Sequence, residues 1–472
     1  MRTMPWRIFR IGLFMTCVGL FAPALFAQAG ASSQFASGES HPETLLVFPF
    51  ENASRNASLD WLGDALSELT IERLQDRGVP MLTRQDRLAT LEKMGLPDSA
   101  RFSHATIIKI AIEADADAVV YGQYASDGKT VTMQAWVLRI SPPSLSPPMK
   151  QTSTMQDLLR AQARLTWQIV CTVDPGRCPA QGANRDETSF SDPPPSLRMD
   201  ALKDFVQGLT GSDDETRLPL LREASRLEPA WDRPPFELGL IYFGRHDCES
   251  ALPWFSRVPP NRPNGPEASF DAGVCHLLRN DPARAEAAFS GLTARARSTD
   301  PQVRIPELPE AHNNLGVSRL RLGNWNAAVT EFERAAALDP DERDYLVNLG
   351  IARLSGKQTA AAVTAFERAR KLDPDDKDTS ALLISALESM GRNTDAAAVR
   401  DDAGEIGGHP VGAITQAVLQ DPVALARMAR VSEHFDRTLL RTNGEDAAAR
   451  PRSASPRSAP PPRARDSMGD PK

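Results

Sequence analysis

The sequence lacks the motifs that mark most enzyme families. It contains no H-E-x-x-H, no G-x-S-x-G and no G-x-G-x-x-G, so metalloproteases, serine hydrolases of the nucleophile-elbow type and dinucleotide-binding folds leave no signature here. The segment GIARLSGK (350–357) is close to a phosphate-binding loop. It has one residue too many between its glycines, and Gln358 stands where a magnesium-binding Ser or Thr is required. We therefore expect no catalytic residue, no cofactor and no metal site.

Cysteine and positive net charge are also scarce. Five cysteines in 472 residues are too few for a fold built on disulfides. The formal net charge of -7 leaves no overall basic field, so we expect no nucleic-acid partner. Hydrophobic residues make up 41% and charged residues 24%, as in ordinary folded proteins, and the length allows two to four domains.

Long apolar runs are absent except at the N-terminus. Arg2, Arg7 and Arg10 precede a nearly continuous apolar stretch, residues 11–26, and a small-residue cleavage pattern at 27–29. This is the pattern of a secretory signal peptide. We expect residues 1–29 to be removed on export, which leaves no transmembrane span in the mature chain; a retained membrane anchor is the alternative.

Residues 44–178 read as an α/β domain with a mixed sheet. The segment LLVFPF (45–50) is apolar at successive positions, as expected of a short strand buried on both faces, and Pro49 suits the end of such a strand. The remaining expected elements are helices at about 59–77, 85–95, 104–114 and 154–170, and strands at 79–84 and on both sides of the turn at 127–128.

Three short motifs in this domain resemble the TolB amino-terminal, FlgO and CsgG-like families. They are FPFENAS (48–54), LGDAL (62–66) and ADADAVVYGQY (114–124), the last with Ala where the family has Gly. The resemblance covers roughly 130 residues and implies an α/β domain of the bacterial cell envelope. It implies that the mature protein is periplasmic or associated with the envelope.

Low-complexity segments separate and flank the folded parts. Residues 30–43 read as a flexible leader, and residues 179–198 as a linker stiffened by the triple proline at 193–195. We expect helices at 411–442 and a disordered tail at 443–472. The tail is rich in Arg, which allows a weak peripheral contact with an anionic envelope surface, although a solvated tail is the simpler interpretation.

A 34-residue repeat dominates the second half. Leu315-Gly316, Ala328, Phe332, Ala335 and Pro340 recur 34 positions later as Leu349-Gly350, Ala362, Phe366, Ala369 and Pro374. This is the period of the tetratricopeptide repeat, a pair of antiparallel helices, so we expect an all-α superhelix over residues 199–410. The best repeats are 232–265, 266–299, 309–342 and 343–376, with worn pairs at 198–231 and 377–410.

Cysteine pairing follows partly from these elements. Cys171 ends a predicted helix and residues 174–176 form a turn, so we expect a disulfide between Cys171 and Cys178; two free thiols are the alternative. Cys248 and Cys275 fall at buried packing places of two repeats. There the pattern favours free thiols. A disulfide, or a zinc quartet of both cysteines with His246 and His276, is left open.

The repeat register also predicts a binding groove. Places 2, 5, 9 and 12 of each first helix line the groove of such repeats. Here these places include a mostly apolar stripe: Phe236, Leu240, Phe243, Phe270, Val274, Leu277, Asn313, Val317, Leu320, Val347, Ile351 and Leu354. Relatives that clamp a terminal carboxylate combine Asn with Lys, but no lysine accompanies Asn313 and Asn348. An apolar peptide or helix suits such a stripe; the alternative is that it packs on the chain's own N-terminal domain or linker.

We therefore interpret the chain as an exported interaction scaffold of the cell envelope that binds a protein partner through its repeats. The alternative is a ligand-binding regulatory subunit of an envelope enzyme or transport assembly, acting through the α/β domain.

Overall fold

The computed structural model describes residues 43–54, 56–98, 100–178, 190, 197–300, 303–406, 409–410, 414 and 416–441. The chain separates into two units, Met1–His41 and Pro42–Lys472, and all described residues belong to the second. The expected signal peptide, nearly all of the leader, most of the linker and the tail from 443 lie outside the described residues. Within the described part of the chain, no helix is long and apolar enough to cross a membrane.

The first part of the fold is a mixed sheet, as the sequence predicts. Its central strand β1 (Leu45–Val47) runs parallel to β3 (Met81–Leu82) on one side and to β4 (Ala118–Ser126) on the other. From β4 the pairing is antiparallel, through the turn at 127–128 to β5 (Thr130–Arg139). The remaining strands are β2 (Glu51–Asn52) beside β4, and β6 (Ser144–Leu145) and β7 (Met149–Thr154) beside β5.

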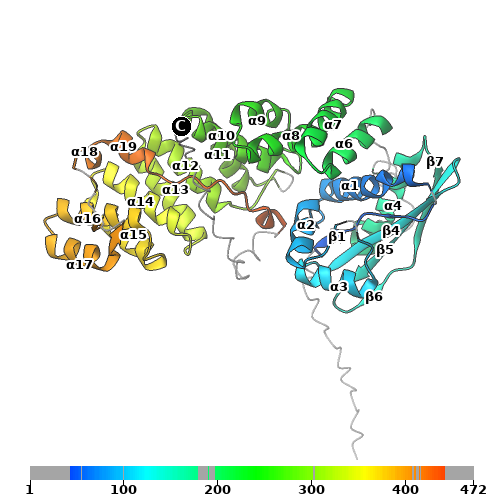
Figure 1. The fold of residues 1–472 in the computed structure, drawn as a ribbon, viewed down its shortest axis with the longest axis horizontal. Coiled ribbons are helices and arrows are strands. Elements are labelled where there is room, and N and C mark those ends of the chain that lie inside the picture. Colours follow the sequence, from blue (N-terminus) through cyan, green and yellow to red (C-terminus); the bar gives the residue numbers. More distant parts are fainter. Residues whose placement is uncertain are drawn as a thin grey trace, which may run out of the picture. The chain divides into compact units, whose positions relative to one another are not determined.

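Helices cover both faces of this sheet (Figure 1). Leu45 and Val47 share an apolar core with α1 (Trp61–Asp76) and α4 (Leu158–Val173). Leu46 and Phe48 point the other way, into a core with α2 (Arg84–Lys93) and α3 (His104–Glu113). Successive side chains of a strand alternate between faces, so a strand covered on both sides must be apolar at every position. That is why residues 45–48 show no alternation.

The motif FPFEN (48–52) and the motif LGD (62–64) meet in space. Phe50 N–H donates to the Gly63 carbonyl oxygen (3.1 Å), and a Cβ at position 63 would lie 2.3 Å from the Phe50 carbonyl oxygen. Only glycine permits this approach. The Asn52 side chain accepts from Ser54 N–H (2.9 Å) and donates to Asp60 Oδ1 (2.6 Å), which ties the strand exit to the start of α1. These motif residues therefore fix the turn between β1 and α1.

The second part of the fold is a run of antiparallel helix pairs (Figure 1), which confirms the predicted superhelix. The pairs are α6 (Met199–Thr210) with α7 (Asp214–Leu227), α8 (Arg233–Gly244) with α9 (Cys248–Phe255), α10 (Gly265–Leu278) with α11 (Pro282–Ala296), α12 (Pro309–Arg321) with α13 (Trp325–Leu338), α14 (Arg343–Ser355) with α15 (Thr359–Leu372), and α16 (Lys377–Ser389) with α17 (Asn393–Ala403).

Two local features make these pairs recur. Aspartates cap several of the helices; Asp213, Asp247, Asp281 and Asp376 each accept a hydrogen bond from a backbone N–H three residues ahead. In each central pair, a glycine of the first helix lies against the ring of a phenylalanine of the second, so the two backbones approach closely. These contacts are Gly239 with Phe255, Gly273 with Phe289, Gly316 with Phe332 and Gly350 with Phe366.

The four cysteines among the described residues form two disulfides. Cys171 is bonded to Cys178 across the turn, and Cys248 is bonded to Cys275, joining α9 to α10. The second bond corrects the expectation of free thiols and leaves no thiolate for a zinc site. The repeat register predicted that both residues lie in the core. Whether two core positions of neighbouring repeats come within bonding distance depends on the tertiary packing.

In the oxidised protein, the four cysteines of these two bonds should not react with a thiol reagent under denaturing conditions. Loss of the Cys171–Cys178 bond should lower the free energy of unfolding by only about 2.5 kcal/mol. A bond that closes so short a loop removes little entropy from the unfolded chain. Labelling followed by peptide mass mapping, with and without reductant, checks both bonds. Modification of Cys171 and Cys178 without reductant would show that they are free.

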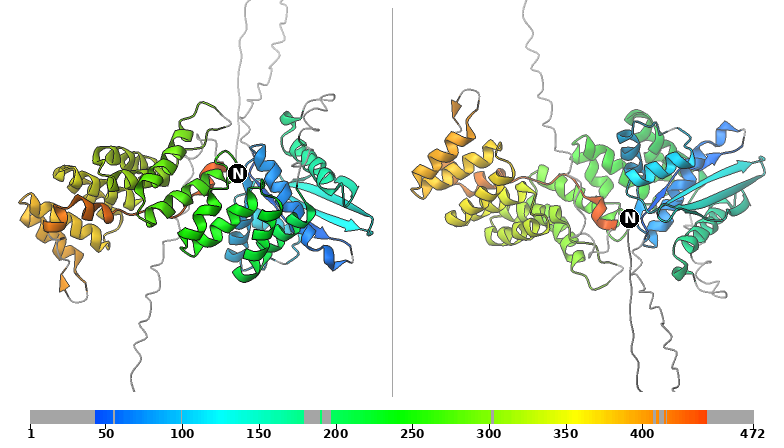
Figure 2. Two further views of the ribbon diagram at one scale, coloured as in Figure 1. Left: turned by 90° about the horizontal axis from the view of Figure 1, so that it is seen from above. Right: turned by 90° about the horizontal axis from the view of Figure 1, so that it is seen from below.

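The chain beyond the last pair is less helical than expected. Short strands β8 (Glu405–Ile406) and β9 (His409–Pro410) and short helices α18 (Gln416–Leu419) and α19 (Pro422–Arg427) come first. Residues 428–436 then take no regular structure before a 3-10 turn, η3 (Arg437–Arg441). Figure 2 shows this last stretch running from α19 back along the helix pairs to η3.

Candidate functional site

The predicted groove is not an open apolar stripe. Phe270, Val274, Leu277, Val317, Leu320, Val347 and Ile351 are all at most 1% exposed, Asn313 and Phe236 are also buried, and Leu240, Phe243 and Leu354 are partly buried. The expectation that these positions form the exposed face of the pairs is therefore wrong for most of them. A substitution such as Leu277→Ser would damage the core as well as the groove.

The groove is occupied by the chain's own C-terminal region. We call residues 428–437 the groove segment. Leu425, Ala429, Phe435 and Leu439 belong to the same apolar core as the predicted groove residues of α10, α12 and α14. The N-terminal domain covers the groove only at the first helix pairs, where Phe236 shares an apolar core with Ala65 and Leu69 of α1. Elsewhere the cover is α19 together with the groove segment. Most of the linker, the other expected cover, lies outside the described residues.

Two asparagines hold the backbone of the groove segment. Asn348 Nδ2 donates to the Arg430 carbonyl oxygen and Asn348 Oδ1 accepts from Arg430 N–H, both at 2.7 Å. Asn314 makes the same pair of bonds with Ser432, both at 2.8 Å. The two contacted residues are two apart, as are the residues on one side of an extended chain. We call Asn314 and Asn348 the amide ladder.

A third asparagine closes the network. Asn313 Nδ2 donates to the Arg430 carbonyl oxygen (3.1 Å) and to Ser432 Oγ (3.0 Å), while its own Oδ1 accepts from Asn348 Nδ2 (2.8 Å). The predicted residues Asn313 and Asn348 are thus brought together. They bind the middle of a chain and not a terminal carboxylate, in accord with the missing lysine.

Carboxylates of the first helices bind the two arginines of the groove segment. Arg430 Nη1 donates to Asp344 (2.6 Å) and its Nη2 lies 2.7 Å from an Asp376 oxygen. Arg437 Nε donates to Glu267 (2.6 Å). Between them, Asp436 N–H donates to Glu310 (3.1 Å). Charge-assisted bonds of this kind are stronger than neutral ones.

The electrostatics of these acids reflect their burial. Burial would raise the pKa of Asp376, but hydrogen bonds from Thr379 and Arg430 and the charge of Arg430 outweigh it, so the pKa is lowered. Burial raises the pKa of Asp271 well above its ordinary value, and the charge of Glu267 raises it further. Arg437 opposes that rise. Arg430 therefore stabilises the ionised form of Asp376, whereas burial favours the neutral form of Asp271.

The polar residues of this site recur at equivalent places of successive repeats, a pattern that an apolar stripe does not include. Asn314 and Asn348 are 34 residues apart, as are Glu310 and Asp344, so each pair occupies one place of successive repeats. Asp271 and Glu267 occupy the same two places of the preceding repeat, across the insertion. Polar residues that recur in register on first helices are therefore as informative as apolar ones.

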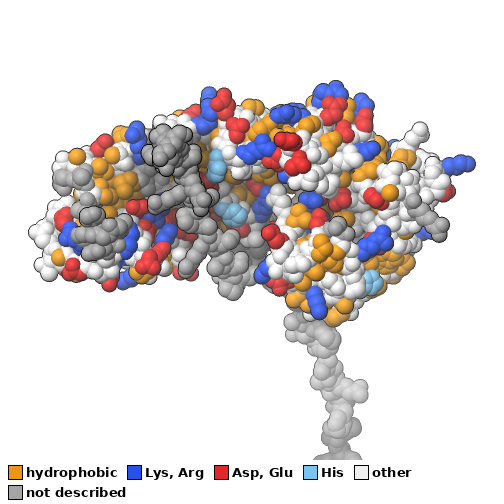
Figure 3. Space-filling model, in the orientation of Figure 1, with side chains coloured by type: hydrophobic (Ala, Val, Ile, Leu, Met, Phe, Trp, Pro, Cys, Tyr) orange, Lys and Arg blue, Asp and Glu red, His pale blue; other side chains and the backbone are white. Residues whose placement is uncertain are grey.

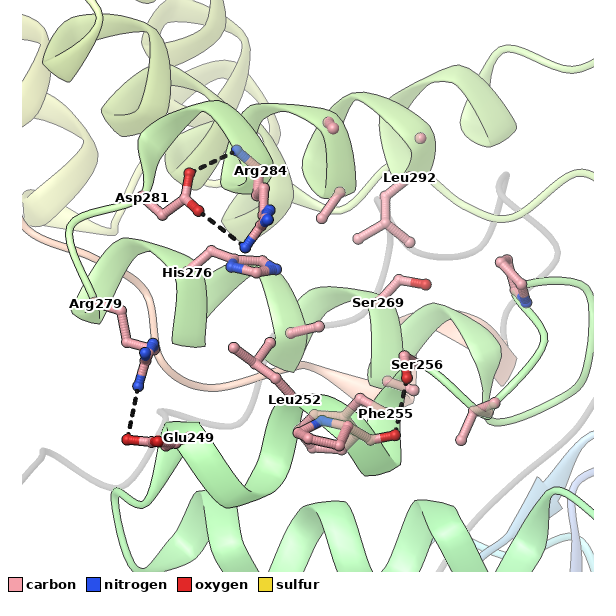
Figure 4. Close-up of a pocket in the computed structure, with 18 of the residues that line it drawn as sticks. Glu249, Leu252, Phe255, Ser256, Ser269, His276, Arg279, Asp281, Arg284 and Leu292 are labelled. Carbon is pink, nitrogen blue, oxygen red and sulfur yellow. Dashed lines mark hydrogen bonds and ion pairs between the residues drawn. The ribbon is translucent and has the colours of Figure 1, made fainter.

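A second candidate is a cavity of about 940 Å³ between α9, α10 and α11. Figure 4 shows the ion pairs at its rim, Arg279 with Glu249 and Arg284 with Asp281, and His276 among them. Burial lowers the pKa of His276. No residue of the groove segment lines this cavity.

The buried His312 takes part in a structural network. His312 Nδ1 lies 2.6 Å from Glu331, which also accepts from Arg319 (2.7 Å), and this network joins α12 to α13. Among the residues that the structure describes, no group of His, Cys, Asp and Glu could hold a metal ion. Acidic and basic side chains are interspersed over the face drawn in Figure 3, so this face shows no large patch of one sign.

Acid should loosen the groove segment. The pKa of Asp376 is lower in the folded chain than in the unfolded chain, so its contribution to stability is present above about pH 4 and is lost as pH falls through its folded value. We expect proteolysis within residues 428–436 to accelerate below about pH 4, measured with a protease that is active from pH 3 to 6 and corrected at each pH for its rate on an unfolded substrate. Asp376→Asn keeps a helix cap but should show faster cleavage already at pH 6 and a flatter profile. A wild-type rate that does not change between pH 3 and 6 would contradict this.

A family model for the tetratricopeptide repeat matches residues 236–301 and 313–377. These segments are tetratricopeptide repeats, a fold of protein-interaction scaffolds. Similar solved structures include MamA (20% identity, 35% of this chain and 92% of that chain, TM-score 0.31) and MamA from Desulfovibrio magneticus RS-1 (19%, 36% and 92%, 0.33). A third is YrrB, a repeat protein with an unusual peptide-binding site (16%, 39% and 90%, 0.33). No relative was found among the curated proteins.

Proposed function

We propose that this chain is an exported scaffold of the bacterial cell envelope whose repeats hold an extended peptide between their first helices. The amide ladder carries the proposal. An amide side chain that binds both the N–H and the C=O of one residue replaces the bonds that this residue would make with water or a neighbouring strand. Such contacts accept an extended chain of many sequences and reject a helix, whose backbone groups are already paired.

The α/β domain would supply a second attachment. Its three motifs resemble those of the TolB amino-terminal, FlgO and CsgG-like families, which supports a place in the envelope. The roles of Asn52 and Gly63 are structural in this chain, so the resemblance concerns the fold and not a shared ligand site.

Peptide selection from a random library tests the binding function. Full-length chain carrying Arg430→Glu and Phe435→Ala, which loosen the groove segment, would be used as bait. Selected peptides should lose binding when Asn314→Ala and Asn348→Ala are added, and should keep it when Asn326→Ala, an exposed asparagine of α13, is added instead. If no peptide is enriched, or if the ladder substitutions change nothing, the repeats do not use this groove for peptides.

Export is tested separately by the mass of the mature protein. Expressed with its own N-terminus in a Gram-negative host, the chain should be recovered from the periplasm starting near Gly30. Recovery of the intact N-terminus in the cytoplasm or the membrane would remove the export part of the proposal.

A further inference from the structure

We propose that the groove selects an extended peptide with arginine at its first position, a small hydroxyl residue at its third, an aromatic residue at its sixth and arginine at its eighth. Residues 430–437 are a resident copy of this ligand, which a partner segment of the same pattern displaces. The inference rests on the proposed function and adds the specificity of the same groove. Its basis is the juxtaposition of the amide ladder with acidic sites and an aromatic site in one register.

The first position is defined by two carboxylates. Asp344 lies in α14 and Asp376 caps α16, and each lies within 2.7 Å of a different terminal nitrogen of Arg430. A guanidinium presents several N–H groups in a fixed planar fork, whereas an ammonium is a compact point charge. Two carboxylates on separate nitrogens therefore favour arginine over lysine.

The third position is defined by its hydrogen bonds. Both backbone groups of Ser432 are bound by Asn314, and its hydroxyl oxygen accepts from Asn313. A small side chain with an acceptor oxygen satisfies the buried amide, which would otherwise lack one of its partners. By contrast, Glu433 and His434 are exposed, so the fourth and fifth positions should tolerate most residues.

The last two anchors lie against the preceding repeat. The Phe435 ring is 5.4 Å from the Phe270 ring, and the side chain is 5% exposed. Arg437 binds Glu267, beside the buried Asp271. The contacts therefore run from α14 and α16 at the first position to α10 at the eighth, so a bound peptide has one direction and one register.

The resident segment is suited to act as a competitor. It is tethered through α19, so its effective concentration at the groove is in the millimolar range expected of short linkers. A free peptide with the same contacts must compete with it. Its apparent affinity for the unmodified chain should therefore be at least tenfold weaker than for a chain whose segment has been released.

Fluorescence anisotropy with a labelled synthetic peptide of residues 428–441 tests this directly. The released full-length chain, Arg430→Glu with Phe435→Ala, should bind the peptide at least tenfold more tightly than the unmodified chain. The control chain, Arg427→Glu with Val423→Ala, changes an arginine and an apolar residue that are both exposed in α19 and should behave as the unmodified chain. Peptides with Arg430→Ala or Phe435→Ala should bind the released chain at least tenfold more weakly than the parent peptide.

Several results would overturn the inference. Equal binding of the parent and substituted peptides would remove the pattern, and no gain in the released chain would remove the competition. If circular dichroism shows that the released chain is unfolded, the milder pair Arg430→Ala with Phe435→Leu replaces it under the same criterion. A doubled mass of the unmodified chain in solution, lost in the released chain, would assign the groove to the segment of a second copy.

The library selection separates this inference from the proposed function. If the selected peptides depend on the amide ladder but lack this spacing of Arg and aromatic residues, the groove binds peptides with a different specificity. An absence of any ladder-dependent peptide would end both proposals.

Discussion

Phe366→Ala is expected to lower the free energy of unfolding by about 3–5 kcal/mol, as is typical for truncation of a buried aromatic residue. The Phe366 ring is completely buried in α15. It fills the seam against Gly350 of α14, where even a methyl group would approach the ring to 2.3 Å. Truncation would leave a cavity that the rigid helix pair cannot close. Urea denaturation monitored by circular dichroism measures the change.

The matched control is Leu372→Ala in the same helix. Leu372 is 43% exposed, so its truncation should cost well under half as much as that of Phe366. Similar losses from the two substitutions would mean that the Gly–Phe seam does not hold the repeats together. Because neighbouring repeats stabilise one another, the loss from Phe366→Ala should appear across the whole superhelix.

Removing the amide ladder, by Asn314→Ala with Asn348→Ala, should release the groove segment while the helix pairs stay folded. The two side chains make four hydrogen bonds to the segment, each contributing about 0.5–1.5 kcal/mol. We expect a loss of about 2–6 kcal/mol in the local stability of the segment. The amides of Arg430 and Ser432 should then exchange with solvent roughly 30- to 20,000-fold faster, because 1.4 kcal/mol corresponds to a factor of ten.

Hydrogen exchange read by mass spectrometry distinguishes local release from unfolding. Peptides from α12 and α14 should keep their protection in the double variant, while peptides covering residues 428–437 should lose it. Asn326→Ala on the outer helix α13 provides the control and should leave both regions unchanged. Loss of protection throughout α12–α15 would show that the asparagines stabilise the repeats themselves and do not serve as a detachable contact.

In the α/β domain, the local sequence pattern predicted the central strand but not every edge strand. The continuous apolar run at 45–48 predicted a strand covered on both faces, because alternation disappears only when neither face meets water. Strand β7 was missed, because its burial pattern alternates between partly buried and exposed positions and its residues are mostly polar. An edge strand of that kind is stabilised by its pairing with β5, which local hydrophobicity does not reveal.

In the second half, the sequence by itself determined the helix pairs and their register. Each repeat is built from contacts within about 34 residues, such as Gly350 with Phe366, so its pattern is written locally and recurs. Only the tertiary structure decided what fills the groove and that Cys248 meets Cys275. Asn313 and Arg430 are 117 residues apart, and the groove segment shows no hydrophobic period of its own. Its extended conformation comes from bonds to side chains of distant helices, which no local pattern encodes.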